Sequence, residues 1–188
     1  MKPFIGIKNI WYGPPLTADL KNVAAIKALV EGATFTKVTN SHDGTWGYSQ
    51  DDPDVTEYKN ELNGKTYYRD KVSDGAKTIT FTMGVYDFKQ LADLQGGTVI
   101  EDTSNPIGWK ADDDSLENVE KAFIAQTKTG NYIVFSNASV VAKTDQQEKN
   151  LGLGITAVCL ESNTAGVASV LFLFSRDSNP ERGSGVKK

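Results

Sequence analysis

Apolar and polar side chains alternate strictly along residues 77–83, where Ile79, Phe81 and Met83 are separated by threonines. An extended chain points successive side chains to opposite faces, so one face of this segment is apolar and the other is polar. The pattern predicts a half-buried β-strand, and we take this strand as the nucleus around which the rest of the chain packs.

The residues that follow predict a short helix with its own start and stop signals. The Asp87 side chain can accept from the amide of Gln90, and the Gln90 side chain can reach back to the amide of Asp87, which together form a capping box. Tyr86 and Leu91 have the spacing of a hydrophobic staple. The double glycine at 96–97 favours the end of this helix, and the chain then becomes extended again.

The N-terminal part predicts a strand, a helix and a strand. Apolar residues between 4 and 11 indicate the first strand, which a Gly-Pro-Pro turn closes. Thr17 or Asp19 can cap a helix that runs to about Val30 with an apolar face at helical spacing. Residues 33–39 alternate again and predict the second strand.

An acidic stretch follows at residues 46–62, and we expect it to form a long hairpin arm or an exposed loop. It carries five carboxylates around one proline and offers little that could pack in a core. The pair Asn63 and Gly64 tolerates the positive φ of a type I′ turn, so it predicts a hairpin that joins a strand within 55–62 to one within 65–72.

The remaining chain predicts strands separated by turns and polar segments. We expect a polar loop at 101–118, a charged and mobile connector at 145–150, and a frayed, flexible tail from about residue 175. The predicted strands are 119–127, 132–142, 151–159 and 167–174.

This order of elements predicts a mainly β, β-rich α+β protein. About eight to ten short strands are joined mostly by turns rather than by helical crossovers, which favours an antiparallel β-sandwich or barrel. One short α-helix flanks it, with a second helix near the N-terminus. We see no internal repeat and no linker, so we expect residues 1–188 to form a single domain.

Composition and charge exclude some partners. The chain has 188 residues, of which 39% are hydrophobic and 23% are charged, and its net charge is −4. These values are typical of a globular domain rather than of a disordered chain. A surface that binds DNA phosphates needs clustered Lys and Arg side chains. The sequence contains no long block of like charges. We therefore expect no dedicated nucleic-acid-binding surface.

The cysteine content and the N-terminus indicate an intracellular site of synthesis. The only cysteine, Cys159, lies in an apolar alternating run, so we expect a small buried side chain and no disulfide within one chain. Lys8 and Asn9 interrupt the N-terminal apolar run, which makes it too short for a signal peptide or a membrane span. We expect no membrane contact.

The only histidine gives weak support for catalysis. His42 lies in a turn-like Asn-Ser-His-Asp-Gly segment. A serine-histidine-aspartate reading with Asp43 or Asp70 lacks the Gly-x-Ser-x-Gly motif that exposes a nucleophile. We interpret His42 as a turn residue.

The acidic stretch offers a glycosidase pair as an alternative, because two carboxylates at a suitable separation can cleave a glycosidic bond. A long arm is a poor support for two carboxyl groups that must keep a fixed geometry. The candidate carboxylates are Asp51, Asp52, Asp54 and Glu57, with Trp46 and Tyr48 as a sugar platform.

Three further motifs have simpler structural interpretations. The aspartate run at 112–114 resembles calcium ligands but lacks the spacing of a calcium loop, so we interpret it as a solvated loop or a helix cap before Leu116. Gly152 and Gly154 lie within an alternating run and form no phosphate loop. Asn137 begins a glycosylation sequon that we attribute to chance. We therefore expect no enzyme, no catalytic residue, no cofactor and no metal site.

Several segments resemble the major tail proteins, or tail tube proteins, of tailed phages. KTITFTMGVYDFKQLADLQGGTVI is similar to the strand, short helix and double glycine of that family, with its D-x-x-x-L-A-x-L-x-G-G pattern. DDPDVTEYKNELNGKTYY resembles the acidic arm with a Pro-x-x-Thr-Glu pattern that precedes it. TKTGNYIVFSNASVVAKT and LGLGITAVCLE resemble the closing strands. The resemblance covers roughly Val38 to Phe174, and the N-terminal segment to about Val30 departs from the shorter one of the family.

The resemblance implies a structural protein of the virion tail, made in the cytoplasm of a bacterial host. It implies a β-sandwich that self-assembles into hexameric rings, which stack into a tube through which DNA passes without specific binding. The implied partners are other copies of the chain and further tail components such as tape measure, terminator or sheath proteins. A neutral or acidic bore would not hold the phosphate backbone, which agrees with the negative net charge.

A non-enzymatic binding module is the alternative. In that case Trp46, Tyr48 and Trp109 would recognise a carbohydrate or another protein, as in adhesins and receptor-binding domains. The two hypotheses differ in where these aromatic side chains lie. Convergence on one concave, exposed patch favours binding, whereas dispersal among the core and contact surfaces favours assembly.

The predicted helix at 87–95 carries the first test. With no catalytic constellation elsewhere, we interpret it as a brace on one side of the sandwich. Replacing Leu91 with Asp places a charge in an apolar contact, and we expect it to abolish soluble folded protein or assembly. Circular dichroism and gel filtration measure this outcome, and a Leu91→Asp protein that keeps both fold and assembly contradicts the interpretation.

Overall fold

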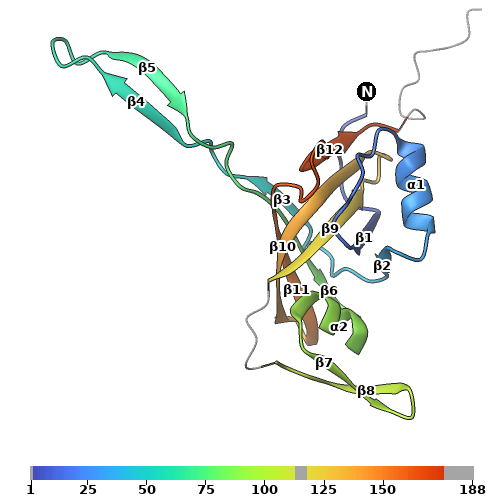
Figure 1. Cartoon of the computed structure of the whole chain (residues 1–188). Coiled ribbons are helices and arrows are strands. Elements are labelled where there is room, and N and C mark those ends of the chain that lie inside the picture. Colours follow the sequence, from blue (N-terminus) through green and yellow to red (C-terminus); the bar gives the residue numbers. More distant parts are fainter. Residues whose placement is uncertain (1, 113–117, 176–188) are drawn as a thin grey trace, which may run out of the picture.

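The computed structural model describes residues 2–112 and 118–175 (Figure 1). The protein is mainly β with two helices, and its paired strands are antiparallel, which confirms the predicted fold class. The described residues contain twelve strands, more than the eight to ten predicted. In chain order the elements are β1 (Asn9–Gly13), α1 (Val23–Glu31), β2 (Thr36–Val38), β3 (Gly47–Gln50), β4 (Val55–Lys59), β5 (Thr66–Lys71), β6 (Lys77–Met83), α2 (Phe88–Gln95), β7 (Thr98–Asp102), β8 (Asn105–Lys110), β9 (Val119–Gln126), β10 (Tyr132–Gln147), β11 (Asn150–Cys159) and β12 (Val170–Leu173).

Eight strands form one sheet, and two pairs of strands stand apart from it. The sheet has the order β2-β1-β9-β10-β11-β6-β3, and β12 pairs with the first residues of β10. Its two end strands, β2 and β3, do not pair with each other, so the sheet stays open and no barrel closes within the described residues. β4–β5 and β7–β8 are separate two-stranded ribbons.

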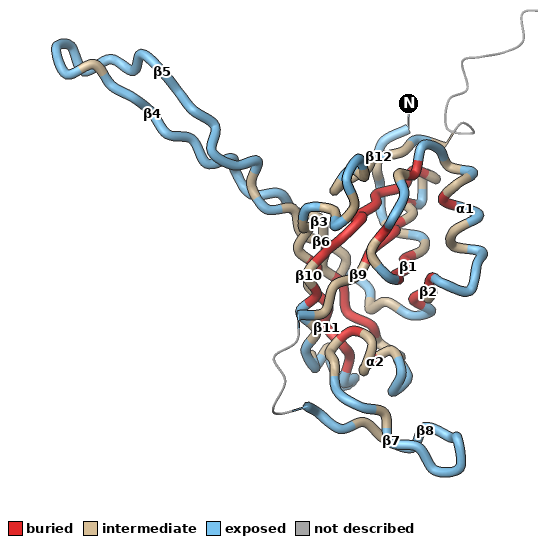
Figure 2. The backbone as a smooth tube through the Cα atoms, in the orientation of Figure 1, coloured by how far each residue is buried: buried red, intermediate tan, exposed pale blue. Residues whose placement is uncertain are grey.

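The sheet is apolar on both faces where helices cover it. On β9, Phe123 points into the larger core that the curved sheet encloses together with α2, whereas Ile124 points to the opposite face beneath α1. Leu94 of α2 and Ile26 of α1 are fully buried on these two faces. Figure 2 shows the buried positions concentrated on the central strands, while both ribbons are almost wholly exposed.

A bulge in β10 keeps its apolar residues on the correct face. Phe135 lies opposite Phe123 and Ala138 lies opposite Lys121, so Ser136 and Asn137 share one position across from Ala122. Before the bulge the residues that face the larger core have odd numbers, such as Phe135, and after it they have even numbers, such as Ala138. The Ser136 amide and hydroxyl donate to backbone oxygens of the segment before β12, at 2.9 and 2.5 Å, so the extra residue is tied down.

The predicted strand at 77–83 and the predicted short helix that follows it are confirmed as β6 and α2. The Asp87 carboxylate accepts from the Gln90 amide at 2.7 Å, and the Gln90 side chain accepts from the Asp87 amide at 3.1 Å. Gly96 and Gly97 follow with φ of 80° and 87°, a conformation that favours glycine. The helix ends where the sequence predicts.

The N-terminal helix begins later than predicted. Its N-cap is Asn22, whose side chain accepts from the Ala25 amide at 2.9 Å, and neither Thr17 nor Asp19 caps it. The amide of Leu16 donates to Ser136 of β10 at 2.8 Å, and Leu16 is buried. This hydrogen bond holds the segment around Leu16 against the sheet, so the helix begins only after Asn22.

Three loop predictions are corrected. The Asn63–Gly64 turn is not type I′, because only Gly64 has a positive φ and its amide closes a wider loop by donating to Asn60 at 2.7 Å. The segment predicted as a polar loop at 101–118 contains most of the β7–β8 ribbon. The segment predicted as a mobile connector at 145–150 continues the β10–β11 hairpin, in which Gln147 lies opposite Asn150. The frayed tail after residue 175 and the cap before Leu116 lie outside the described residues.

The capping box of α2 gives a prediction about stability. Asp87→Ala removes the acceptor for the Gln90 amide, and we expect it to lower the free energy of unfolding by about 1 kcal/mol. Urea unfolding followed by circular dichroism measures this change. Lys89→Ala, on an exposed position of the same helix, is the matched control and should stay within about 0.5 kcal/mol of the parent. Equal losses in the two variants contradict the assigned cap.

Candidate functional site

The largest uncovered structure is the β4–β5 ribbon with its base, residues 51–76, which we call the arm. Every residue of both its strands is exposed, and it projects far from the sheet (Figures 1 and 2). The arm is inserted between β3 and β6, which pair directly with Gln50 opposite Lys77. The sequence predicts this exposed hairpin, and the structure confirms it.

Two hydrogen bonds and one close backbone contact at a glycine hold the base of the arm. The Asp51 amide donates to Ala76 at 2.9 Å, and the Gln50 side chain donates to the Asp74 carbonyl at 3.0 Å. Gly75 has φ of 75°, and a Cβ atom there would lie 2.1 Å from the Asp51 carbonyl oxygen. Lys71 forms an ion pair with Asp74 at the same place, and this ion pair lowers the pKa of the Asp74 carboxyl.

The two faces of the arm carry different side chains. On one face Tyr58 and Tyr68 lie opposite each other with ring centroids 5.7 Å apart. On the other face Glu57 and Arg69 form an ion pair of 3.1 Å between exposed groups. Pairs of this kind contribute little to stability in water, so the arm depends mainly on its backbone ladder.

The second uncovered ribbon is β7–β8, residues 98–110, which we call the lower hairpin. The Trp109 indole donates to the Gly96 carbonyl at 2.9 Å and so anchors the ribbon to the end of α2. Gly97 lies in the same contact, since a Cβ atom there would be 2.7 Å from the Trp109 nitrogen. Thr103 and Ser104 form its tip with positive φ values. It projects from the end of the body opposite the arm (Figure 1).

Each ribbon contains a bulge whose extra residue has a large, exposed side chain. Tyr67 is the extra residue where Tyr58 and Lys59 lie opposite Tyr68 and Thr66. Ile107 is the extra residue of the lower hairpin, where Ile100 and Glu101 lie opposite Gly108 and Pro106. Both extra side chains are largely exposed. Bulges disrupt the local pairing of a ribbon, and the side chains at these two positions are not covered by the described residues.

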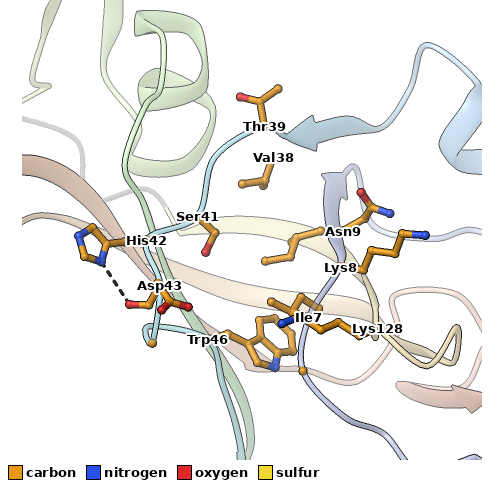
Figure 3. A pocket seen from close by; sticks show the side chains of 13 residues that line it. Ile7, Lys8, Asn9, Val38, Thr39, Ser41, His42, Asp43, Trp46 and Lys128 are labelled. Carbon is orange, nitrogen blue, oxygen red and sulfur yellow. Dashed lines mark hydrogen bonds between the residues drawn. The ribbon is translucent and has the colours of Figure 1, made fainter.

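His42 lines a pocket of about 370 Å³ but lies in no catalytic group (Figure 3). Its Nδ1 atom lies 3.2 Å from the Asp43 carbonyl oxygen, and its own amide donates to Thr82 at 2.8 Å. Asp70, the other predicted partner, lies on the arm. Figure 3 shows the His42 ring at the edge of the pocket, on the side opposite Lys8. The segment therefore connects β2 to β3 as a turn tied to β6.

The carboxylates of the arm do not form a glycosidase pair in a cleft. Asp51, Asp52 and Asp54 are exposed along its base. Asp54 accepts from the Ser73 hydroxyl at 3.1 Å, and Glu57 is paired with Arg69. Residues 2–112 and 118–175 contain no group of three histidine, cysteine, aspartate or glutamate side chains that could hold a metal ion. Of the aspartate run at 112–114, only the first residue is described, and it is exposed.

The three candidate aromatic residues do not gather on one exposed patch. Tyr48 packs edge-on against Phe135 and Phe172, at 6.2 and 5.7 Å between ring centroids. Trp46 packs against the larger core from the turn before β3. Trp109 holds the lower hairpin on α2. All three are half-buried and serve local packing.

The other motifs also serve packing. A Cβ atom on Gly152 would lie 2.7 Å from the Thr82 side chain, so this glycine allows β11 and β6 to approach. Asn137, the sequon residue, is 1% exposed in the bulge of β10, and its side chain donates to the Glu120 carboxylate at 3.0 Å. Asn163 donates to the same carboxylate, and the two hydrogen bonds lower the pKa of Glu120.

The sequence predicts the arm but not the lower hairpin. The polar residues between Ile100 and Ile107 indicated a loop, because charged and turn-forming residues occupy most of that stretch. The signal that could have found it is the Thr-Ser-Asn-Pro turn between two short runs that each contain a β-branched residue.

Burial of Cys159 gives a prediction about its reactivity. The thiol is half-buried within 3.5 Å of the carbonyl oxygens of Leu160 and Ser169, and burial raises its pKa. A raised pKa leaves less thiolate at any pH below it, so we expect the folded protein to react with a disulfide reagent at pH 8 more slowly than the protein unfolded in guanidinium. Absorbance of the released thiol measures both rates, and equal rates contradict the described burial.

Neither helix of the described chain has the length and the apolar stretch needed to span a bilayer. Comparison of the sequence with protein-family models and with curated proteins gives no match. The resemblance to tail tube proteins therefore stays a prediction, and the two uncovered ribbons are the feature of the described residues that most needs a functional explanation.

Proposed function

We propose that this chain is a structural protein that assembles with copies of itself into rings, which stack to form the tube of a phage or prophage tail. The observation that carries the proposal is the pair of ribbons that leave opposite ends of the body with exposed side chains. Surfaces on opposite ends of one subunit are those that head-to-tail assembly uses.

The energetics of the arm support contact with another chain. A two-stranded ribbon in water is marginally stable, because it has no third layer to bury its side chains. Leu62 at its tip is 95% exposed, and Val55 and Val72 near its base are also uncovered. Full burial of one such side chain against a neighbour contributes about 1.5–3 kcal/mol. Assembly would supply the burial that the single chain does not.

The outer face of β10, β11, β6 and β3 suits the wall of a passage. Cross-strand rows there join small or short polar residues, such as Thr156 with Thr80 and Thr80 with Gly47. Lys143 on β10 and Asp145 two residues later bring opposite charges to the same face. A surface without clustered cations offers few contacts to DNA phosphates, so DNA would pass without specific binding.

The binding-module alternative lacks comparable support, because its three aromatic residues are dispersed and half-buried. Catalysis has none either, since the described candidate residues do not converge. In the proposed tail, the further partners would be the tape measure, terminator or sheath components that contact the ends or the outside of a tube.

Removal of the arm tests the proposal. Residues 52–75 can be replaced by Asn-Gly, because Asp51 and Ala76 are already hydrogen-bonded neighbours and a two-residue turn closes such a hairpin. We expect the shortened protein to fold with equal or greater stability, since a shorter loop costs less closure entropy, and to lose all rings and tubes.

Negative-stain microscopy and sedimentation at rising concentration measure assembly, and thermal unfolding checks the fold. Val141→Ala, on an exposed position of β10, is the control and should assemble like the parent. A parent protein that stays monomeric at every concentration and forms no rings contradicts the proposed function.

A further inference from the structure

The tips of the two ribbons have opposite charge. Lys59 and Lys65 flank the turn of the arm, where the Asn60 amide donates to Lys65 at 2.9 Å, and Glu61 is the one acid between them. The lower hairpin carries Glu101 and Asp102 at the end of β7 and has no basic residue before Lys110. One tip is therefore net positive and the other net negative.

None of these four flanking charges forms an ion pair in the part of the chain that the structure describes. The ion pairs of residues 2–112 and 118–175 are Glu57–Arg69 and Lys71–Asp74. Both tips also expose a large apolar side chain, with Leu62 95% and Ile107 60% accessible. Each tip thus combines an exposed apolar group with charges that form no ion pair among the described residues, although the Asp102 carboxylate accepts a hydrogen bond from the Thr103 hydroxyl at 3.1 Å.

The chain cannot bring its own tips together. The arm leaves the body at one end, and the lower hairpin leaves it at the other (Figure 1). The glycine contact at Gly75 and the Trp109 bond to Gly96 hold the two bases in place. Only a second copy of the chain, placed head to tail, can present the lower hairpin to the arm.

We propose that the tip of the arm docks on the lower hairpin of another copy of this chain. Leu62 packs against Ile107, while Lys59 and Lys65 face Glu101 and Asp102. The contact is heterologous, because it joins different surfaces of two identical subunits, and its repetition builds an open series of subunits. This inference rests on the proposed function and names the partner surface within it.

Paired cysteines test the contact directly. Leu62→Cys and Ile107→Cys are made separately in a Cys159→Ser background, mixed, and treated with a short bifunctional thiol reagent. We expect a cross-linked dimer from this mixture. Val141→Cys replaces Ile107→Cys in the control mixture, because Val141 is 62% exposed and lies on the outer face of β10 rather than on the lower hairpin. Equal yields from the two mixtures, or no cross-link in an assembled sample, overturn the proposal.

Charge reversal provides the second measurement. Lys59→Glu/Lys65→Glu and Glu101→Lys/Asp102→Lys should each raise the protein concentration needed for assembly by at least about tenfold, since like charges then face each other. The four changes combined should restore assembly toward the parent value. A combined variant that assembles no better than either double variant overturns the pairing.

The outcomes separate this contact from the proposed function. If the parent forms tubes, both charge reversals leave the concentration needed for assembly unchanged, and no selective cross-link forms, the docking is overturned and the proposed function stands. A selective cross-link between copies that form no rings or tubes supports the docking and contradicts the tail-tube assignment.

Discussion

Ser136 and Asn137 of β10 lie together opposite a single residue of β9, and the rest of the sheet depends on this bulge. β10 pairs with β9, β11 and β12, more partners than any other strand of the described sheet has. A strand of sixteen residues without the bulge would turn Ala138 and Val140 outward and lose one half of its core face. The bulge lets one strand serve both the part of the sheet beneath α1 and the part that encloses the larger core.

The body and the ribbons therefore differ in what stabilises them. The body buries apolar side chains on both faces of its central strands, so its fold needs no further surface. The ribbons have hydrogen bonds and exposed side chains but no covering layer, and their direction is set at a few backbone contacts such as Gly75 beside Asp51. This division separates folding, which the body carries out, from the contacts with other copies that we propose for the ribbons.

Local signals allowed the sequence to predict α2 and the arm. The capping box at Asp87 and Gln90 lies within four residues, and the exposed hairpin follows from an acidic stretch next to Asn-Gly. The start of α1 could not be predicted, because the bond from Leu16 to Ser136 joins residues far apart in the sequence. The strand order and the separation of both ribbons from the main sheet depend on similar long-range pairing. The lower hairpin could not be predicted, because charged and turn-forming residues occupy most of the stretch between Ile100 and Ile107 and leave only a weak alternation.

The anchoring of Trp109 on Gly96 has a mechanical consequence. The indole joins the lower hairpin to the last turn of α2 through one hydrogen bond and a close glycine contact, and the arm likewise leaves the body at a narrow base. In a stack of subunits joined through such ribbons, bending would be taken up by these slender connections, while the sheets would move as stiff blocks. The curvature that the whole filament tolerates would then be set by ribbon length and by the bonds at each base, independently of the strength of the core.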